Sequence, residues 1–329
     1  MWFQSLTGFD EETAEQVRTH LSVEGAIMTS RVNGRQMACG RLETPSLSEL
    51  RSRVALHSLQ QGSLRLSEVV GDVQALHLQP ANAGALFQVA SQFNLLEMVS
   101  PSVTPELGVD IYERDRTQGP ACAIACGAGT IYRNYFVEVN GHVGQTCDRQ
   151  IDCLRELATA LGNTDERLWT MRNGYALASA EGLSEIADRL SSSDESQRDT
   201  LRRMLRIGIQ WDTEVTLENA GHRVSQAYCS ALPVAYSPHS SELWAEFAQL
   251  VLDAAYEAVM YAAALNASST GNNKVFLTLL GGGAFGNDDA WIFAAIRRAI
   301  HAFRDVDLDV AIVSYGSSKP SVQEVVNEW

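Results

Sequence analysis

The sequence predicts an α/β fold, a three-layer α/β/α sandwich with extra N-terminal helices and a long helical and loop insertion. Two short runs, residues 275–280 and 310–315, are almost continuously apolar, as strands are when helices cover both faces of a parallel sheet. A helical pattern over 288–303 separates them. Strand, helix and strand at this spacing favour a right-handed parallel crossover. A strand over 224–236 and a long helix over 242–265 precede this unit.

Local signals predict the earlier elements. Residues 1–65 are expected to form an N-terminal helical segment packed on the core, with Ser46 and Glu49 as a capping box at a helix start. The α/β domain then spans residues 66–329. Strand-like bursts are expected over 64–78, a loop over 79–84, a helix over 85–98 and a loop over 110–119. Pro120 opens a helix of small residues, and 132–139 has strand character.

An insertion is expected around residues 140–222, where helix-like stretches alternate with polar loops. The serine-rich tract 191–196 predicts a surface loop, with a domain boundary as the alternative. Residues 207–211 are expected to form a strand that ends just before Asp212. No internal repeat is visible.

The charge balance excludes several classes of function. The 329 residues carry a net charge of −15, from 25 basic and 40 acidic side chains, and only Lys274 and Lys319 are lysines. Such a balance argues against nucleic acid and anionic membranes as partners. No Gly-Lys-Ser/Thr triplet of a Walker-type phosphate loop occurs. The chain begins without signal-peptide features, and its most apolar long stretch carries three carboxylates, so we expect a cytoplasmic protein with reduced cysteines.

A glycine-rich segment is the strongest single feature for binding. It is expected to lie at the carboxyl end of a parallel strand, just before a helix, where free backbone amides and the helix dipole favour a phosphate. A tight turn that binds nothing is the alternative. Asp288, at the helix start, suits capping as well as a site. The segment consists of Gly281, Gly282, Gly283, Ala284, Phe285, Gly286 and Asn287.

Several other polar residues have either a structural role or a role in a binding site. Gln92 and Asn94 are expected on an otherwise apolar helix, where they either cap backbone groups or reach a ligand. Asp115 shares a loop with Gln118 and either caps the amide of Thr117 or faces a cleft. Asp212 is either a solvated turn residue or a site residue at the end of a strand.

These segments resemble a known family. Residues 281–287 resemble the loop with which macrodomains hold the diphosphate of ADP-ribose, and the resemblance implies that Phe285 packs on a ribose. Residues 80–84 resemble the asparagine loop of that fold, which implies that Asn82 contacts the distal ribose. Segments 88–97, 115–122, 132–136 and 228–233 resemble a divergent macrodomain branch that hydrolyses ADP-ribose from modified arginine. The resemblance spans 76–315 and implies a macrodomain-like sandwich, although ordinary macrodomains are about half this length.

The sequence and the resemblance together predict an ADP-ribosyl hydrolase, with arginine as one candidate linkage. A non-catalytic module that binds ADP-ribose or another NAD-derived nucleotide is the alternative, and a scaffold with a vestigial cleft is a third. Cleavage of an N-glycosidic bond needs carboxylates near the anomeric carbon. The candidates are Asp115, Asp212 and Asp288. ADP-ribose or an ADP-ribosylated protein is the expected partner, without a cofactor or metal. The expected ligand-binding residues are Asn82, Gln92, Asn94, Gln118 and residues 281–287.

Overall fold

The computed structural model describes residues 1–56 and 61–329. Its centre is a mixed sheet of seven strands, in which β12, β6, β13, β14 and β5 are parallel, β11 runs antiparallel to them, and the edge strand β4 pairs antiparallel with β11. The predicted parallel pair is confirmed, because Val275 lies opposite Val310. In spatial order the strands are β4 (Arg41–Glu43), β11 (Gly208–Glu214), β12 (Arg223–Cys229), β6 (Leu86–Ala90), β13 (Lys274–Leu277), β14 (Asp309–Ser314) and β5 (Arg65–Val70).

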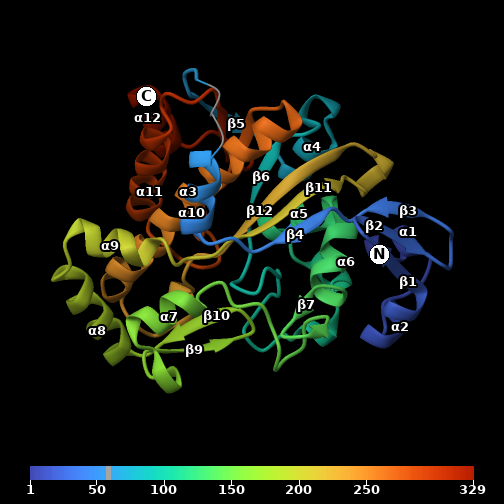
Figure 1. Cartoon of the computed structure of the whole chain (residues 1–329), viewed down its shortest axis with the longest axis horizontal. Helices are drawn as coiled ribbons and strands as arrows, with labels where there is room; N and C mark the ends of the chain where they lie inside the picture. Colours follow the sequence, from blue (N-terminus) through green and yellow to red (C-terminus); the bar gives the residue numbers. More distant parts are fainter. Residues whose placement is uncertain (57–60) are drawn as a thin grey trace.

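Helices cover both faces of this sheet, so the predicted three-layer arrangement is confirmed (Figure 1). One face is covered by α10 (Ser241–Thr270), which packs on β12, β6 and β13 and against α11 (Asp289–Ala302) and α3 (Leu47–Leu56). The other face carries α4 (Val73–Leu78), α5 (Gln118–Ala125) and α6 (Gly127–Tyr135). The last helix, α12 (Pro320–Glu328), packs on the edge strand β5.

The N-terminal segment differs from the expected helical one. It contains α1 (Trp2–Thr7) and α2 (Ala14–His20), followed by an antiparallel sheet of β1 (Leu21–Glu24), β2 (Ile27–Ser30) and β3 (Gln36–Ala38). Gly25 and Gly34 take positive φ angles of 58° and 75° in the turns between short strands, a conformation that glycine adopts without strain. The capping box before α3 is confirmed, since the Ser46 amide donates to Glu49 and the Glu49 amide donates to Ser46 Oγ.

Three further segments differ from the prediction. Residues 85–98 form the central strand β6 and a loop, not a helix, because a strand buried on both faces lacks the alternation that distinguishes strand from helix. Residues 132–135 close α6, so the predicted strand over 132–139 is reduced to β7 (Glu138–Val139), which pairs with β8 (His142–Val143). Similarly, 64–78 contains β5 and then α4, whose N-cap is Asp72.

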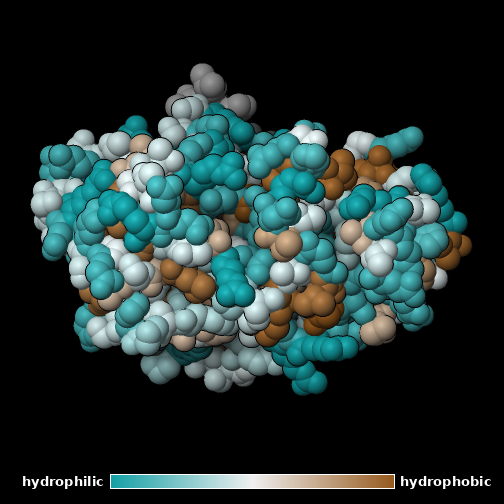
Figure 2. Space-filling view, turned by 90° about the horizontal axis from the view of Figure 1, so that it is seen from below, coloured by the Kyte–Doolittle hydropathy of each residue, from teal (hydrophilic) through white to brown (hydrophobic). Residues whose placement is uncertain are grey.

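The segment 140–222 is an elaboration around one edge of the molecule. It contains α7 (Arg155–Leu161), the hairpin of β9 (Trp169–Arg172) and β10 (Tyr175–Ala178), α8 (Ala180–Ser191) and α9 (Glu195–Arg202), before the chain re-enters the main sheet as β11. The serine-rich tract forms the short connection between α8 and α9, where Asp194 and Gln197 form a capping box. The face in Figure 2 is mainly hydrophilic, with apolar residues in small separate patches.

Among the described residues, none of the helices combines the length and apolar character that a membrane span requires.

Candidate active site

A cleft lies at the carboxyl ends of the parallel strands β6 and β13. It consists of a first cavity of about 150 Å³ and a second of about 310 Å³. The two adjoin each other, since both are lined by Thr117, Gln118, Thr278, Leu279 and Gly283. In open α/β sheets, ligands bind at the carboxyl ends of the parallel strands.

The glycine-rich segment forms one wall of the cleft. It follows β13 and precedes α11, as the sequence predicts. The backbone amides of Gly283, Ala284 and Phe285 donate to no other group among the described residues, and all three residues line the first cavity. Gly281 has a φ of +77°, and a Cβ atom there would lie 2.4 Å from the Cβ of Ala231. Unpaired amides next to a helix start are suited to bind an anion.

Two residues at the end of this segment support it rather than line the cleft. Asn287 is buried, its Nδ2 donates to the carbonyl of Leu232 at 2.8 Å, and its amide donates to Gly281 at 2.9 Å. Asp288 is exposed and accepts from the amide of Ala290 at 2.8 Å, as the N-cap of α11. The capping alternative therefore accounts for Asp288, and neither cavity is lined by it.

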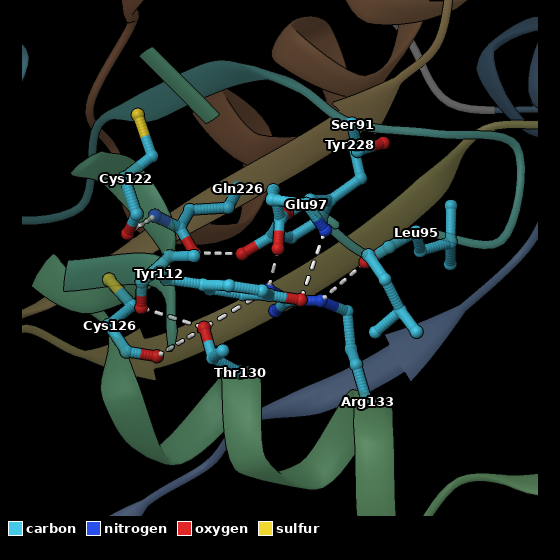
Figure 3. Close-up of polar contacts among 12 residues, drawn as sticks. Ser91, Leu95, Glu97, Tyr112, Cys122, Cys126, Thr130, Arg133, Gln226 and Tyr228 are labelled. Atoms are coloured by element: carbon cyan, nitrogen blue, oxygen red, sulfur yellow. Dashed lines mark hydrogen bonds and ion pairs between the residues drawn. The ribbon is translucent and has the colours of Figure 1, made fainter. Parts of the chain in front are cut away.

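Glu97 lies in the loop after β6 and lines the same cavity as the glycine-rich segment. Its side chain is 1% exposed, yet it lines the first cavity, and neither carboxylate oxygen has a hydrogen-bond partner among the described residues. Burial raises the pKa of Glu97 to about 8, against the opposing effects of the Arg133 charge and the nearby Tyr112 hydroxyl. Glu97 is therefore mainly a neutral acid at pH 7, placed to give a proton to a bound ligand. Figure 3 shows its surroundings.

The polar loop between the two cavities carries Asp115 and Gln118. Asp115 accepts from the amide of Thr117 at 2.9 Å and also lines the first cavity. It is therefore both a cap of the Thr117 amide and a residue that faces the cleft. Gln118 accepts from the amide of Ala90 at 2.8 Å and donates to the carbonyl of Gln88 at 2.8 Å, which ties the start of α5 to the end of β6.

Gln92 and Asn94 lie in the loop after β6, not on the expected helix. Gln92 lines the first cavity and accepts from the amide of Met98 at 2.8 Å. Asn94 is fully buried, accepts from the amide of Leu96 and donates to Gln150, and it does not line the cavity. Both amides therefore fix the shape of the loop that presents Glu97.

Asn82 and Asp212 lie away from the cleft. Asn82 precedes β6 and so lies at the amino ends of the parallel strands, and its Nδ2 donates to the carbonyl of Leu76 at 2.9 Å. Asp212 sits in a β-bulge of β11 with a φ of 55° and pairs with Arg223 at 2.6 Å. Because β11 is antiparallel to β12, its carboxyl end points away from the carboxyl ends of the parallel strands. The structure therefore does not bring Asp212 together with Asp115.

Three aromatic side chains gather in the first cavity. Ring centroids are 5.3 Å apart for Tyr175 and Phe285, 5.5 Å for Tyr236 and Phe285, and 5.1 Å for Tyr175 and Tyr236. All three line the cavity and offer flat apolar surfaces to a sugar or base. Phe285 was expected here, whereas the two tyrosines come from distant segments and have no local sequence signal.

Glu97 is the site residue that the sequence analysis missed. Its one signal is a single carboxylate among Leu95, Leu96 and Met98, where an ionised side chain would be costly to bury. Among the described residues, no group of three His, Cys, Asp or Glu side chains is placed to hold a metal ion.

Glu97 should also make stability depend on pH. A carboxyl group whose pKa rises from 4.5 when unfolded to about 8 when folded binds more protons in the native state, so native stability falls as pH rises between these values. We expect the wild type to lose about 3.5 kcal/mol relative to Glu97→Gln from pH 5 to 8. Urea unfolding of both proteins across this range measures the difference, and parallel curves would contradict the buried neutral acid.

Comparison with known proteins gives structural likeness only. No family model matches the chain, and no curated protein matches it. Among solved structures, poly(ADP-ribose) glycohydrolase from Thermomonospora curvata is similar with a TM-score of 0.46 and 12% identity, over 99% of this chain and 98% of that one. The Deinococcus radiodurans enzyme in complex with ADP-ribose has a TM-score of 0.44 and 13% identity, over 97% of each chain. With TM-scores below 0.5, these likenesses carry no weight for the activity, which has to follow from the cleft itself.

Proposed function

We propose that this protein is an ADP-ribosyl hydrolase that releases ADP-ribose from modified protein side chains. The observation that carries the proposal is the position of Glu97, a buried and mainly neutral carboxyl group, in the same cavity as the unpaired amides of residues 283–285. An anion-binding segment and a proton donor in one cavity match a substrate with a diphosphate and a bond that must be protonated to break.

The two cavities divide such a ligand between them. The diphosphate would bind the amides of residues 283–285, which need no basic side chain. The terminal ribose would enter the first cavity, against Phe285 and beside Glu97. The nucleoside would occupy the larger second cavity, which Asp72, Arg116 and Lys319 line. The strongly acidic chain can thus hold a small nucleotide without a basic patch.

The reaction then needs one proton donor and one carboxylate. Glu97 gives its proton to the leaving nitrogen as the bond between that nitrogen and the anomeric carbon breaks. Asp115 stabilises the positive charge that develops on the sugar and takes a proton from the attacking water. The water oxygen bonds to the anomeric carbon, which yields free ADP-ribose and the unmodified side chain. Asp212 has no part in this scheme, and Asp288 serves as a helix cap.

Arginine is the linkage that the charge of the first cavity favours. Among the described residues, the acidic residues Glu97 and Asp115 line this cavity, and no lysine or arginine lines it. The basic residues Arg116 and Lys319 line the second cavity instead. A guanidinium can donate two hydrogen bonds to a single carboxylate, so a modified arginine suits a cavity in which Asp115 is the carboxylate and Glu97 is the neutral acid.

Calorimetry and a cleavage assay test this function. We expect ADP-ribose to bind with a micromolar Kd, and we expect ADP-ribose to be released from a peptide modified on arginine faster than from one modified on serine. Binding without release from either peptide would make the protein a reader of ADP-ribose. If ADP-ribose does not bind, the proposal as a whole is wrong.

A further inference from the structure

We propose that Arg133 is a positioning residue, which supplies a fixed positive charge beside Glu97 and leaves both oxygens of that carboxyl group free for the substrate. The inference rests on the role of Glu97 in the proposed function. It concerns a residue of α6 that lines neither cavity of the cleft.

Arg133 is held by groups other than Glu97. Its side chain is fully buried, Nε donates to the carbonyl of Leu95 at 3.1 Å and Nη2 donates to Thr130 Oγ1 at 3.0 Å. The guanidinium carbon lies 3.7 Å from the centre of the Tyr228 ring, which adds a cation–π contact. Figure 3 shows Arg133 rising from α6 toward Leu95, with Thr130 beside it. These contacts fix the charge without any help from the carboxyl group.

Glu97 approaches this charge without a hydrogen bond. Its Oε1 lies 3.7 Å from Arg133 Nη2, beyond the 2.7–2.9 Å that is usual for a charge-assisted hydrogen bond. Neither oxygen of Glu97 has another partner among the described residues, whereas its amide donates to Tyr112 Oη at 3.0 Å. An ion pair that served stability alone would be expected to close this gap. The observed arrangement keeps the electrostatic effect and leaves the proton of Glu97 available.

The other titratable groups around the pair are neutral near pH 7. Tyr112 faces Glu97 from the short helix 110–114, Tyr228 from β12 and Cys122 from α5, while Cys126 at the end of α5 faces Arg133. Burial raises the pKa of each of these four groups above its ordinary value. The charge of Arg133 is therefore the larger of the two effects that offset the burial of Glu97, the other being the Tyr112 hydroxyl. Asp115, which lines the same cavity, is acidic and adds no positive charge.

The balance of the two effects has a chemical consequence. Burial alone would hold the proton of Glu97 too tightly to be given up easily, and a neighbouring cation commonly lowers a carboxyl pKa by about 1–3 units. A general acid works best when its pKa is close to the working pH. Arg133 thus lowers the pKa of Glu97 toward the neutral pH range, although it lies outside the cleft.

The test is a direct titration of Glu97 in the whole protein. Carbon-13 labelling of glutamate side chains gives a signal for Glu97, which the Glu97→Gln variant identifies by its loss. We expect the midpoint to rise by about one pH unit or more in Arg133→Met and to return to within about half a unit of the wild type in Arg133→Lys. The basic limb of kcat/KM for ADP-ribose release should move with it.

A second buried arginine provides the matched control. Arg202 on α9 is 3% exposed and pairs with Glu195, far in sequence from the cleft residues, so Arg202→Met should leave the midpoint of Glu97 unchanged. A folded Arg133→Met protein with the wild-type midpoint overturns the inference. An equal shift in Arg202→Met overturns it as well, because it would show a general effect of removing a buried arginine.

Tyr228→Leu decides the question if the Arg133 variants do not fold. Without the ring, the guanidinium can close on Glu97, and the midpoint should fall rather than rise. An unchanged midpoint would contradict the inference. Because the titration needs no substrate, its result is independent of whether the wild type cleaves ADP-ribose, so the two proposals can fail separately.

Discussion

Replacing Glu97 with glutamine should lower kcat for ADP-ribose release by about 10²–10⁴-fold, the usual contribution of a general acid. Glutamine has nearly the same shape but carries no acidic proton. Because Glu97 is mainly neutral at pH 7, the change removes little charge, and the Kd for ADP-ribose should stay within about threefold of the wild type. Single-turnover cleavage and calorimetry on the same preparation measure the two quantities.

A surface glutamate serves as the control for this variant. Glu181 at the start of α8 is exposed, and Glu181→Gln should keep wild-type cleavage. Full activity in Glu97→Gln would show that Glu97 is not the acid, and Asp115 would then be the next residue to replace. A loss of binding that accounts for the whole loss of cleavage would also remove Glu97 from the chemistry.

Replacing Gly281 with alanine should raise the Kd for ADP-ribose at least about tenfold. The φ of +77° is strained for alanine, and the new Cβ would lie 2.4 Å from Ala231 Cβ and 2.7 Å from Asn287 Nδ2. The loop must move to relieve both contacts, which displaces the amides of residues 283–285. Calorimetry with ADP-ribose measures the loss of affinity, and thermal unfolding records the accompanying loss of stability.

Gly271→Ala is the control that distinguishes the effect of backbone strain from the effect of a displaced glycine-rich loop. Gly271 has a φ of +75° at the end of α10, and a Cβ there would meet nothing within 4 Å. Gly271→Ala should therefore lose some stability and retain the wild-type Kd. Equal affinity in Gly281→Ala and the wild type would mean that this loop does not hold the diphosphate.

The sequence predicts elements whose signal is local. Residues 275–280 and 310–315 are apolar runs on either side of a helix, and the structure pairs them in parallel as β13 and β14. The predicted loop 281–287 falls where strand and helix meet, and the Ser46–Glu49 capping box forms between groups three residues apart. In each case the groups that determine the structure lie within a few residues of one another.

The errors arise where distant segments decide the outcome. The central strand β6 is buried on both faces and therefore shows no period that separates a strand from a helix. Asp212 lies within β11, which extends beyond the predicted strand 207–211, and the pairing of β11 with β12 sets the strand direction and places this residue away from the cleft. The same applies to Tyr175 and Tyr236, which meet Phe285 only after folding.

The sequence by itself determined an α/β protein with a glycine-rich loop between a strand and a helix, because apolar periodicity and glycine conformation are properties of short segments. Only the tertiary structure decided which carboxyl group lines the cleft as a buried and mainly neutral acid. Glu97 acquires its protonation state from burial and from Arg133, a residue 36 positions later in the chain, and both effects exist only when β6, α6 and β12 are packed together. The pKa of a side chain depends on its folded surroundings, which no stretch of neighbouring residues contains.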